Sequence, residues 1–383
     1  MPFVEILGLF AGVSTLAMLA GRALNLDWLE AYPLFIQISA PQRVRSLLIK
    51  PAHNMRRLMG LLGDASLPVS AIVGAWALAW LVKTTGQLIK SWGRGPPTVL
   101  PPIPGFTLSF SGEVLFALFF TLLVHELGHA YSAVSQGLEV KKIGFFMLFL
   151  IPGAFVEIDE EALFRAPLRR SARILSSGVG VNAIAACLVL LTGLAAFHGF
   201  PTMPSGVYVE DVVTNGPSWG LIPPGTVIYA INSTRTPTLD DLIRCLREAS
   251  PGELAILETS RGTITVELGA RPDNSSRAWL GVLLSPFGYY SPRLSYLSPS
   301  VAFSLARILL FLVIFNLSAA AINALPALPL DIGRILAILF SRSARDESLS
   351  FSTLSKLLYA LSGAIWGMLG LNLVYSVIKF AGI

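Results

Sequence analysis

Long apolar runs separated by shorter polar stretches dominate the hydrophobic pattern of the chain. Six of these runs reach about 20 residues, the length that a helix needs to cross a bilayer, and they predict six transmembrane helices. Their approximate bounds are 2–21, 67–90, 109–130, 172–198, 301–325 and 352–379. The first run lacks a basic start and a clear small-residue cleavage site, so it is interpreted as a transmembrane helix, with a signal anchor as the alternative.

Two stretches that connect the apolar runs differ from them in composition. Residues 43–59 mix apolar and basic positions and are too polar to cross a membrane, which predicts a helix lying on the membrane surface. An ordinary solvated linker is the alternative interpretation. Residues 93–105 are rich in proline and glycine and predict a rigid loop.

Residues 199–300 differ from the rest of the chain in having polar turns and alternating strand patterns. The segments 207–213 and 263–268 predict strands, because apolar and polar positions alternate in them. Residues 239–249 predict a helix that begins after Thr238, a suitable N-cap. The stretch therefore predicts a small soluble α+β domain inserted between the fourth and fifth transmembrane helices.

The fold class that follows is an all-α polytopic membrane bundle with this inserted α+β domain. We expect residues 1–108 to contain the N-terminal transmembrane helices and the amphipathic surface segment. Residues 109–198 follow as the next pair of helices, residues 199–300 form the insert, and residues 301–383 hold the C-terminal helices.

Composition agrees with a membrane protein: 54% of the 383 residues are hydrophobic and 13% are charged. Soluble domains carry roughly twice that share of charge. The net charge of +5 is modest and its residues flank the apolar runs, which is typical of membrane topology and argues against a nucleic-acid surface. Two cysteines, Cys187 and Cys245, lie in different segments, so neither a thiolate zinc site nor a disulfide framework is expected.

Basic residues gather in three loops that fall on one side of the membrane if six helices alternate. They are Arg22, Arg43, Arg45, Lys50, Arg56 and Arg57, then Lys141, Lys142, Arg165, Arg169, Arg170 and Arg173, then Arg334, Arg342 and Arg345. Because cytoplasmic loops carry an excess of lysine and arginine, this side is predicted to be cytoplasmic. Both chain termini and the inserted domain are then expected outside the cytoplasm.

Residues 124–130, VHELGHA, contain the pattern from which chemistry can be inferred. His125 and His129 are four residues apart, so on a helix both imidazoles lie on one face and can reach one metal ion. Glu126 is placed to act as a general base towards water at that metal. Imidazole ligands favour zinc. Ionisable groups at the end of an apolar run are costly, which favours a Zn²⁺ site over histidines satisfied within a helix core.

A catalytic zinc site needs a third protein ligand. Asp331 is the candidate, because it is the one carboxylate in an apolar segment whose helix is broken by Pro326 and Pro329. An aspartate that caps a helix at the membrane surface is the alternative for this residue, and Glu157 is the competing ligand. His53 and His198, in loops or at helix ends, are not expected to bind metal.

These motifs resemble the site-2 protease family of intramembrane zinc metalloproteases. Residues 125–129 match the family's HExxH helix, and the resemblance covers most of the chain from about 109 to 340. A second motif, Asn-x-x-Pro leading into Leu-Asp-Gly, is matched by Asn323, Pro326, Pro329, Leu330 and Asp331. The chain departs from it at Ile332, where the family usually has glycine, with Gly333 following.

The resemblance implies further site residues. Asn323 is expected to donate a hydrogen bond to the developing oxyanion, with a purely structural amide as the alternative. Gly178 and Asn182 resemble the family's glycine-asparagine helix beside the metal, and Asn182 is expected to contact substrate; close helix packing is the alternative.

Residues 143–158 resemble the family's membrane-embedded β-hairpin. A strand edge there, with Phe145, Phe146 and Leu148, is expected to hold an unwound substrate segment by strand addition, unless the hairpin merely closes the site.

The insert resembles a bacterial PDZ domain through residues 216–232 and through residues 279–284, which resemble the strand bordering a peptide groove. An extended peptide is therefore an expected partner of the insert.

The predicted function is zinc-dependent hydrolysis of peptide bonds within the bilayer. Its partners are transmembrane protein substrates and the lipid bilayer, and no nucleic acid is expected. The zinc site is expected nearer the cytoplasmic side. Three alternatives stay open: a membrane zinc protease that cuts soluble peptides at the cytoplasmic face, a transporter, because interrupted helices also mark those, and an inactive PDZ scaffold.

Overall fold

The computed structural model describes residues 3–91, 111–343 and 351–381. The predicted rigid loop at 93–105 lies outside these residues. The chain divides into two compact units, Met1–Ala186 with Ile314–Ile383, and Cys187–Val313. The helices α6 (Leu168–Ala196) and α8 (Pro299–Asn323) begin in one unit and end in the other.

Within the described residues, six helices are long and apolar enough to cross a membrane, which confirms the six predicted runs as helices. They are α1 (Phe3–Leu24), α3 (Arg56–Lys90), α4 (Gly112–Ser135), α6, α8 and α10 (Phe351–Ala381). The described residues of the first unit also contain three shorter helices: α2 (Gln42–Asn54), α5 (Glu160–Arg165) and α9 (Asp331–Ser343).

The stretch predicted as one surface helix, 43–59, is divided in the structure. The helix α2 ends at Asn54, and the remaining residues form the first turn of α3, which starts eleven residues before the predicted span. One face of α2 packs inward, since Ala52 is fully buried and Leu48 and Ile49 contact the core beside α4. The apolar Leu47 on the other face is 72% exposed. The prediction of a single helix over 43–59 was therefore wrong, whereas its location on the membrane surface stays a prediction.

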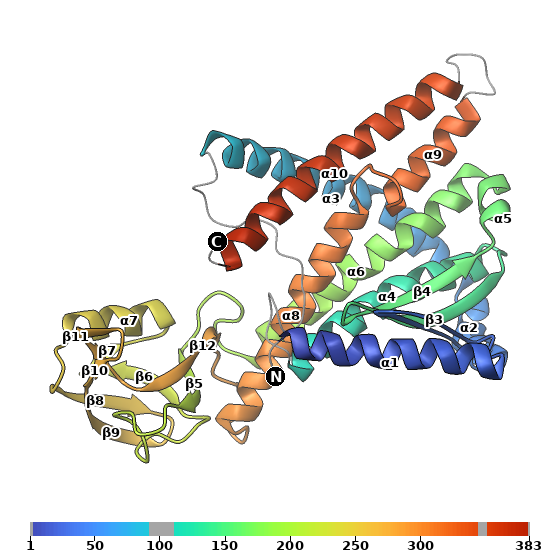
Figure 1. Cartoon of the computed structure of the whole chain (residues 1–383). Helices are drawn as coiled ribbons and strands as arrows, with labels where there is room; N and C mark the ends of the chain where they lie inside the picture. Colours follow the sequence, from blue (N-terminus) through green and yellow to red (C-terminus); the bar gives the residue numbers. More distant parts are fainter. Residues whose placement is uncertain (1–2, 92–110, 344–350, 382–383) are drawn as a thin grey trace. The chain divides into compact units, whose positions relative to one another are not determined.

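Four antiparallel strands form a sheet in the first unit (Figure 1), in the order β1 (Leu29–Tyr32), β2 (Phe35–Ser39), β3 (Val140–Leu148) and β4 (Ile151–Ile158). The predicted hairpin at 143–158 is β3 and β4. The first hairpin was not predicted, although Phe35–Ser39 alternates apolar and polar residues. It pairs in register with β3, from Phe35 opposite Leu148 to Ser39 opposite Gly144.

The tips of the two hairpins carry large apolar residues in the left-handed region. Leu34 (φ 66°), Phe149 (φ 48°) and Leu150 (φ 70°) adopt it, although glycine or asparagine would do so at lower cost. The two tips are joined by a hydrogen bond from Phe149 N to Leu34 O, 3.0 Å long. Phe149 is 50% exposed. Apolar tips of this kind fit an apolar surrounding better than water.

Small residues allow α3 to approach its neighbours closely. A Cβ added to Gly74 would lie 2.3 Å from the carbonyl oxygen of Ala324, and Gly180 of α6 lies directly against Ser66. At the end of the same contact, the Asp64 carboxylate accepts hydrogen bonds from Arg173 and Arg169 of α6. Close packing and interhelical hydrogen bonds of this kind hold membrane helices together.

The second unit is built around a sheet whose main path runs β12-β5-β6-β8-β9, with β7 paired to β6 and a separate β10–β11 pair. The strands are β5 (Gly206–Val212), β6 (Val227–Ile231), β7 (Thr234–Arg235), β8 (Leu254–Thr259), β9 (Gly262–Glu267), β10 (Gly269–Arg271), β11 (Asn274–Trp279) and β12 (Val282–Tyr289). The helix α7 (Leu239–Glu248) buries Leu242 against the sheet. Its N-terminus is a capping box of Thr238 and Asp241, so both predicted strands and the predicted helix are confirmed.

Aromatic packing ties this sheet to the helix ends within the same unit. Tyr208 of β5 stacks on Phe303 of α8 with ring centroids 3.9 Å apart, and Arg307 lies over the Phe303 ring. Phe197, just beyond α6, joins the same buried cluster. The sheet is therefore packed on the end of α6 and the beginning of α8.

Candidate metal centre

The helix α4 presents the two histidines of the HExxH motif on one face. It begins at an N-cap, Ser111, whose hydroxyl accepts a hydrogen bond from Val114 N. His125 and His129 lie one turn apart, and they are only 6% and 8% exposed. Their Nε2 atoms are 3.2 Å apart, so both rings direct the same nitrogen towards one point.

The helix α6 lies against this face of α4 and contacts the opposite nitrogen of each ring. The backbone carbonyl of Ile174 is 2.8 Å from His129 Nδ1. A carbonyl oxygen only accepts, so His129 Nδ1 carries the proton and Nε2 keeps its lone pair for a metal. The side-chain amide of Asn182 is 3.3 Å from His125 Nδ1.

Asp331 is brought to the histidines by the broken segment between α8 and α9. This segment is fixed from α10, because the Ser362 hydroxyl accepts a hydrogen bond from Leu328 N and the Trp366 indole donates one to Leu328 O. A Cβ added to Gly333 would lie 2.3 Å from the carbonyl carbon of Ala327, so the chain doubles back tightly here. Asp331 is therefore held as the first residue of α9, 6% exposed.

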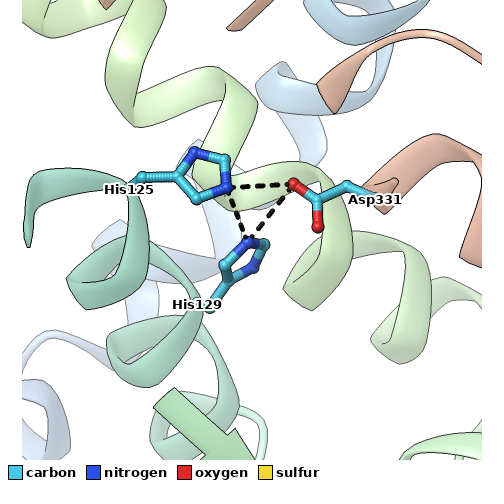
Figure 2. Close-up of side chains that lie close together, drawn as sticks. All are labelled: His125, His129 and Asp331. Atoms are coloured by element: carbon cyan, nitrogen blue, oxygen red, sulfur yellow. Dashed lines mark hydrogen bonds and ion pairs between the residues drawn. The ribbon is translucent and has the colours of Figure 1, made fainter. Parts of the chain in front are cut away.

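Figure 2 shows the three side chains converging from α4 and from the start of α9. Asp331 Oδ2 is 3.3 Å from His125 Nε2 and 3.3 Å from His129 Nε2. In a triangle with sides near 3.3 Å, the central point lies about 1.9 Å from each corner, close to the roughly 2.0–2.1 Å of zinc–nitrogen bonds. The spacing of the three ligand atoms therefore fits a zinc ion that His125, His129 and Asp331 would hold.

A glycine keeps the space beside these atoms free. A Cβ added to Gly178 would lie 2.5 Å from His129 Nε2 and 2.8 Å from His125 Nε2, so any larger residue would clash with both rings. Asp331 Oδ2 is buried and has no hydrogen-bond partner. The free space and the buried carboxylate oxygen both fit a bound cation.

Glu126 follows the first histidine on α4 and lies close to the free edge of the sheet. The backbone N–H of Val156, in β4, lies near the Glu126 carboxylate, because α4 packs against β4. Glu126 is therefore next to the histidines on α4 without belonging to the cluster of candidate metal ligands.

The competing acid Glu157, the neighbouring Asp159 and two histidines lie away from this centre. Glu157 is exposed and sits 3.8 Å from Lys142. Asp159 caps α5, and the Ala162 N–H together with Lys141 holds the pKa of its carboxyl below the ordinary value. His53 and His198 are exposed. Among the described residues, the cluster with metal-ligand geometry is His125, His129 and Asp331.

The structure does not bring Asn323 into contact with this cluster. Its side-chain amide donates a 3.1 Å hydrogen bond to the carbonyl of Ala319, one turn earlier in α8. The oxyanion role of Asn323 stays a prediction.

The residues expected to hold substrate lie in β3, which is an inner strand paired with both β2 and β4. Phe145 packs its ring 5.1 Å from that of Phe119 in α4, Phe146 covers Gly153, and Leu148 is 39% exposed. β3 therefore has no free edge for strand addition, and the substrate contacts of Phe145, Phe146 and Leu148 stay a prediction. The open edge of this hairpin is β4.

The departure at Ile332 has a simple structural basis. Ile332 lies in α9 without a positive φ, and its side chain packs against the cluster formed by Val179, Ala320 and Ala324. Glycine is needed at the next position, Gly333, where the backbone approaches Ala327. The chain therefore keeps its tight turn without a glycine directly after Asp331.

Comparisons with known proteins identify relatives of this chain. The chain is 27% identical to an uncharacterized protein of Methanocaldococcus jannaschii over 280 residues, 70% of this chain and 68% of that protein. It is 33% identical over 138 residues to the membrane-bound transcription factor site-2 protease homolog of Arabidopsis thaliana, 34% of this chain and 26% of that protein. The chain thus spans about a quarter of the length of the Arabidopsis relative.

A structural comparison concerns a short part of the chain. The PDZ domain of the SdrC-like protein from Listeria monocytogenes matches with a TM-score of 0.19 at 18% identity, covering 21% of this chain and 87% of that domain. A score this low does not establish a shared fold.

The apolar helices, the HExxH motif and the converging aspartate define the class of an integral, multi-pass membrane metalloprotease. The model of one family, Peptidase family M50, matches residues 113–362. The chain belongs to peptidase family M50, the site-2 protease family, because this match covers more than half of its length.

Proposed function

We propose that the protein is an intramembrane zinc metalloprotease that hydrolyses peptide bonds in or near transmembrane segments of other membrane proteins. The observation that carries the proposal is the convergence of His125, His129 and Asp331 between helices apolar enough to cross a membrane. Irregular backbone, such as the broken segment before Asp331, is tolerated at membrane depth where it lines a polar site.

The residues at this centre divide the work of hydrolysis. Zinc bound by His125, His129 and Asp331 would polarise the scissile carbonyl and make water more acidic. Glu126 accepts a proton from the attacking water as the oxygen bonds to the carbonyl carbon. When the carbon–nitrogen bond breaks, Glu126 returns this proton to the leaving nitrogen.

The free edge of β4 supports a substrate held as an extended strand. Ile143 O accepts a hydrogen bond from Ala40 N on the β2 side, so the backbone of its partner Val156 points away from β3. By alternation, the N–H and C=O of Ala154 also point to the open edge. A segment paired there would lie near Glu126, because α4 packs against β4. Strand addition to β4 would thus unwind a helix next to the general base.

The sheet itself is proposed to lie within the bilayer. The large apolar residues at its tips, described above, support this placement. The exposed side chain of Phe149 would contact lipid or the substrate helix.

The inserted domain, residues 199–300, is proposed to select substrates as a PDZ-like module. The strand β12 lies at one end of the sheet order, and Leu283 on it is 54% exposed. An exposed strand at a sheet edge can pair with an extended peptide.

The function is tested by cleavage. The purified full chain, reconstituted with zinc, should cut a single-span membrane protein in lipid vesicles, and removing zinc with a chelator should stop cleavage until zinc is returned. A soluble peptide of the same scissile sequence is the control. Cleavage of the soluble peptide alone would move the activity to the membrane surface, and zinc binding with no cleavage of either would overturn the protease assignment.

The proposed topology places the insert outside the cytoplasm and the metal centre nearer the cytoplasmic side, in line with the basic loops. In a Cys187→Ala background, a membrane-impermeant thiol reagent should label Cys245 in intact cells. In a Cys187→Ala/Cys245→Ala background, a cysteine in place of exposed Glu161 should react after permeabilisation only. The reverse labelling pattern would overturn this orientation.

A further inference from the structure

One face of α6 contacts both histidine ligands. Ile174, Gly178 and Asn182 are spaced four residues apart, so they lie on the same side of the helix. Ile174 lies beside His129, Gly178 lies close to the Nε2 atoms of both rings, and Asn182 lies beside His125. The Nδ1 atom of each ring is therefore contacted by a different polar group of α6.

We propose that Asn182 is a positioning residue for the His125 ligand, with its side-chain oxygen accepting a hydrogen bond from His125 Nδ1. This inference rests on the proposed role of His125 as a zinc ligand. It assigns to Asn182 a task different from the substrate contact expected from the sequence.

The argument starts from the tautomer of His125. Its Nε2 faces His129 Nε2 and Asp331 Oδ2, at 3.2 and 3.3 Å, so Nε2 is the metal-binding nitrogen. A neutral imidazole that binds metal through Nε2 carries its proton on Nδ1. The group 3.3 Å from Nδ1 must then be an acceptor.

In the structure, the atom at this distance is the amide nitrogen of Asn182, which is a donor. The oxygen and nitrogen of an amide have the same shape, so their assignment follows from the hydrogen bonds they make. The other atom, Asn182 Oδ1, is buried without a partner, so either orientation leaves one atom of the amide unpaired. Because the protonated Nδ1 of His125 needs an acceptor, we assign the orientation in which the Asn182 side-chain oxygen faces the ring.

The two histidines are thus fixed in the same tautomer by different means. For His129 the acceptor is a backbone carbonyl, which substitution does not remove. For His125 it is a side chain that is 0% exposed, so no water replaces it when it is lost. Partners of this kind typically change metal affinity by roughly 10–100-fold when mutated.

The test compares two substitutions that separate accepting from donating. Asn182→Asp keeps the shape of the side chain, and its ionised carboxylate accepts hydrogen bonds but donates none. Asn182→Leu keeps a similar volume and removes both polar atoms. Zinc affinity is measured on the purified full chain by competition with a chelator, and the absorption of the Co²⁺-loaded protein reports the ligand geometry. We expect Asn182→Leu to lose roughly 10–100-fold in zinc affinity and Asn182→Asp to stay near the wild type.

The matched control is Asn372→Leu. Asn372 is also 0% exposed and donates to Thr85, but it lies in α10 outside the cluster. It should lower the thermal stability of the protein without changing zinc affinity.

An equal loss of zinc affinity in Asn182→Asp and Asn182→Leu would show that the amide nitrogen faces His125. Wild-type zinc affinity in Asn182→Leu would show that Asn182 does not position His125. Zinc affinities in the expected order without any peptide cleavage would overturn the proposed protease function and leave this inference standing.

Discussion

Glu126→Gln should retain zinc and the fold but lose peptide hydrolysis by roughly 10²–10⁴-fold, the usual contribution of a general base. Glutamine has nearly the same shape as glutamate, and its amide oxygen can still accept a hydrogen bond. It cannot take a proton from water, however. The measurement is the rate of cleavage of a membrane-spanning substrate at saturating zinc, together with the zinc content of the purified variant.

The control for this prediction is Glu139→Gln, which removes the same charge from an exposed residue just after α4. It should cleave at the wild-type rate. Near wild-type cleavage by Glu126→Gln would show that another group accepts the proton. Loss of zinc from the same variant would show that Glu126 is a ligand rather than a base.

Much of this site could be predicted because its signals are local in sequence. The spacing of His125 and His129 on one helix fixes their common face, and an isolated carboxylate in an apolar, proline-broken segment identifies Asp331 as a candidate. The six transmembrane helices could be predicted for the same reason, since a membrane-crossing helix needs about 20 consecutive, mostly apolar residues.

The remaining features depend on contacts between distant segments. The hydrogen bond between His129 Nδ1 and the backbone carbonyl of Ile174 has no sequence signature, because every residue type has the same backbone carbonyl. The pairing of β2 with β3 determines that β4 is the open edge, and a hairpin pattern alone does not say which strand a distant segment covers. The boundary between α2 and α3 was missed for a related reason, as the basic residues there belong to two helices.

The role of Asn182 lies between these cases. Its position four residues after Gly178 indicates a helix face that packs closely. The choice between contacting substrate and orienting a ligand becomes possible only when His125 Nδ1 is found beside it.

The largest effect on metal binding is expected at Asp331. Asp331→Ala should weaken zinc binding by more than about 100-fold, beyond the range typical of residues that only orient ligands, and should abolish cleavage. Two histidines alone leave the ion with too few protein ligands, because a catalytic zinc site uses three. Zinc affinity of the purified chain, measured by chelator competition, tests this directly.

Two further variants make the result specific to Asp331. Asp331→Asn keeps an oxygen without the negative charge, so its zinc affinity should fall between those of the wild type and Asp331→Ala. Glu157→Ala removes the competing carboxylate, which is exposed and lies 3.8 Å from Lys142, and should leave zinc affinity unchanged. Full zinc occupancy in Asp331→Ala, with loss of the ion in Glu157→Ala, would move the third ligand to the hairpin. The geometry argues for the opposite outcome, since Asp331 Oδ2 is equally close to both Nε2 atoms.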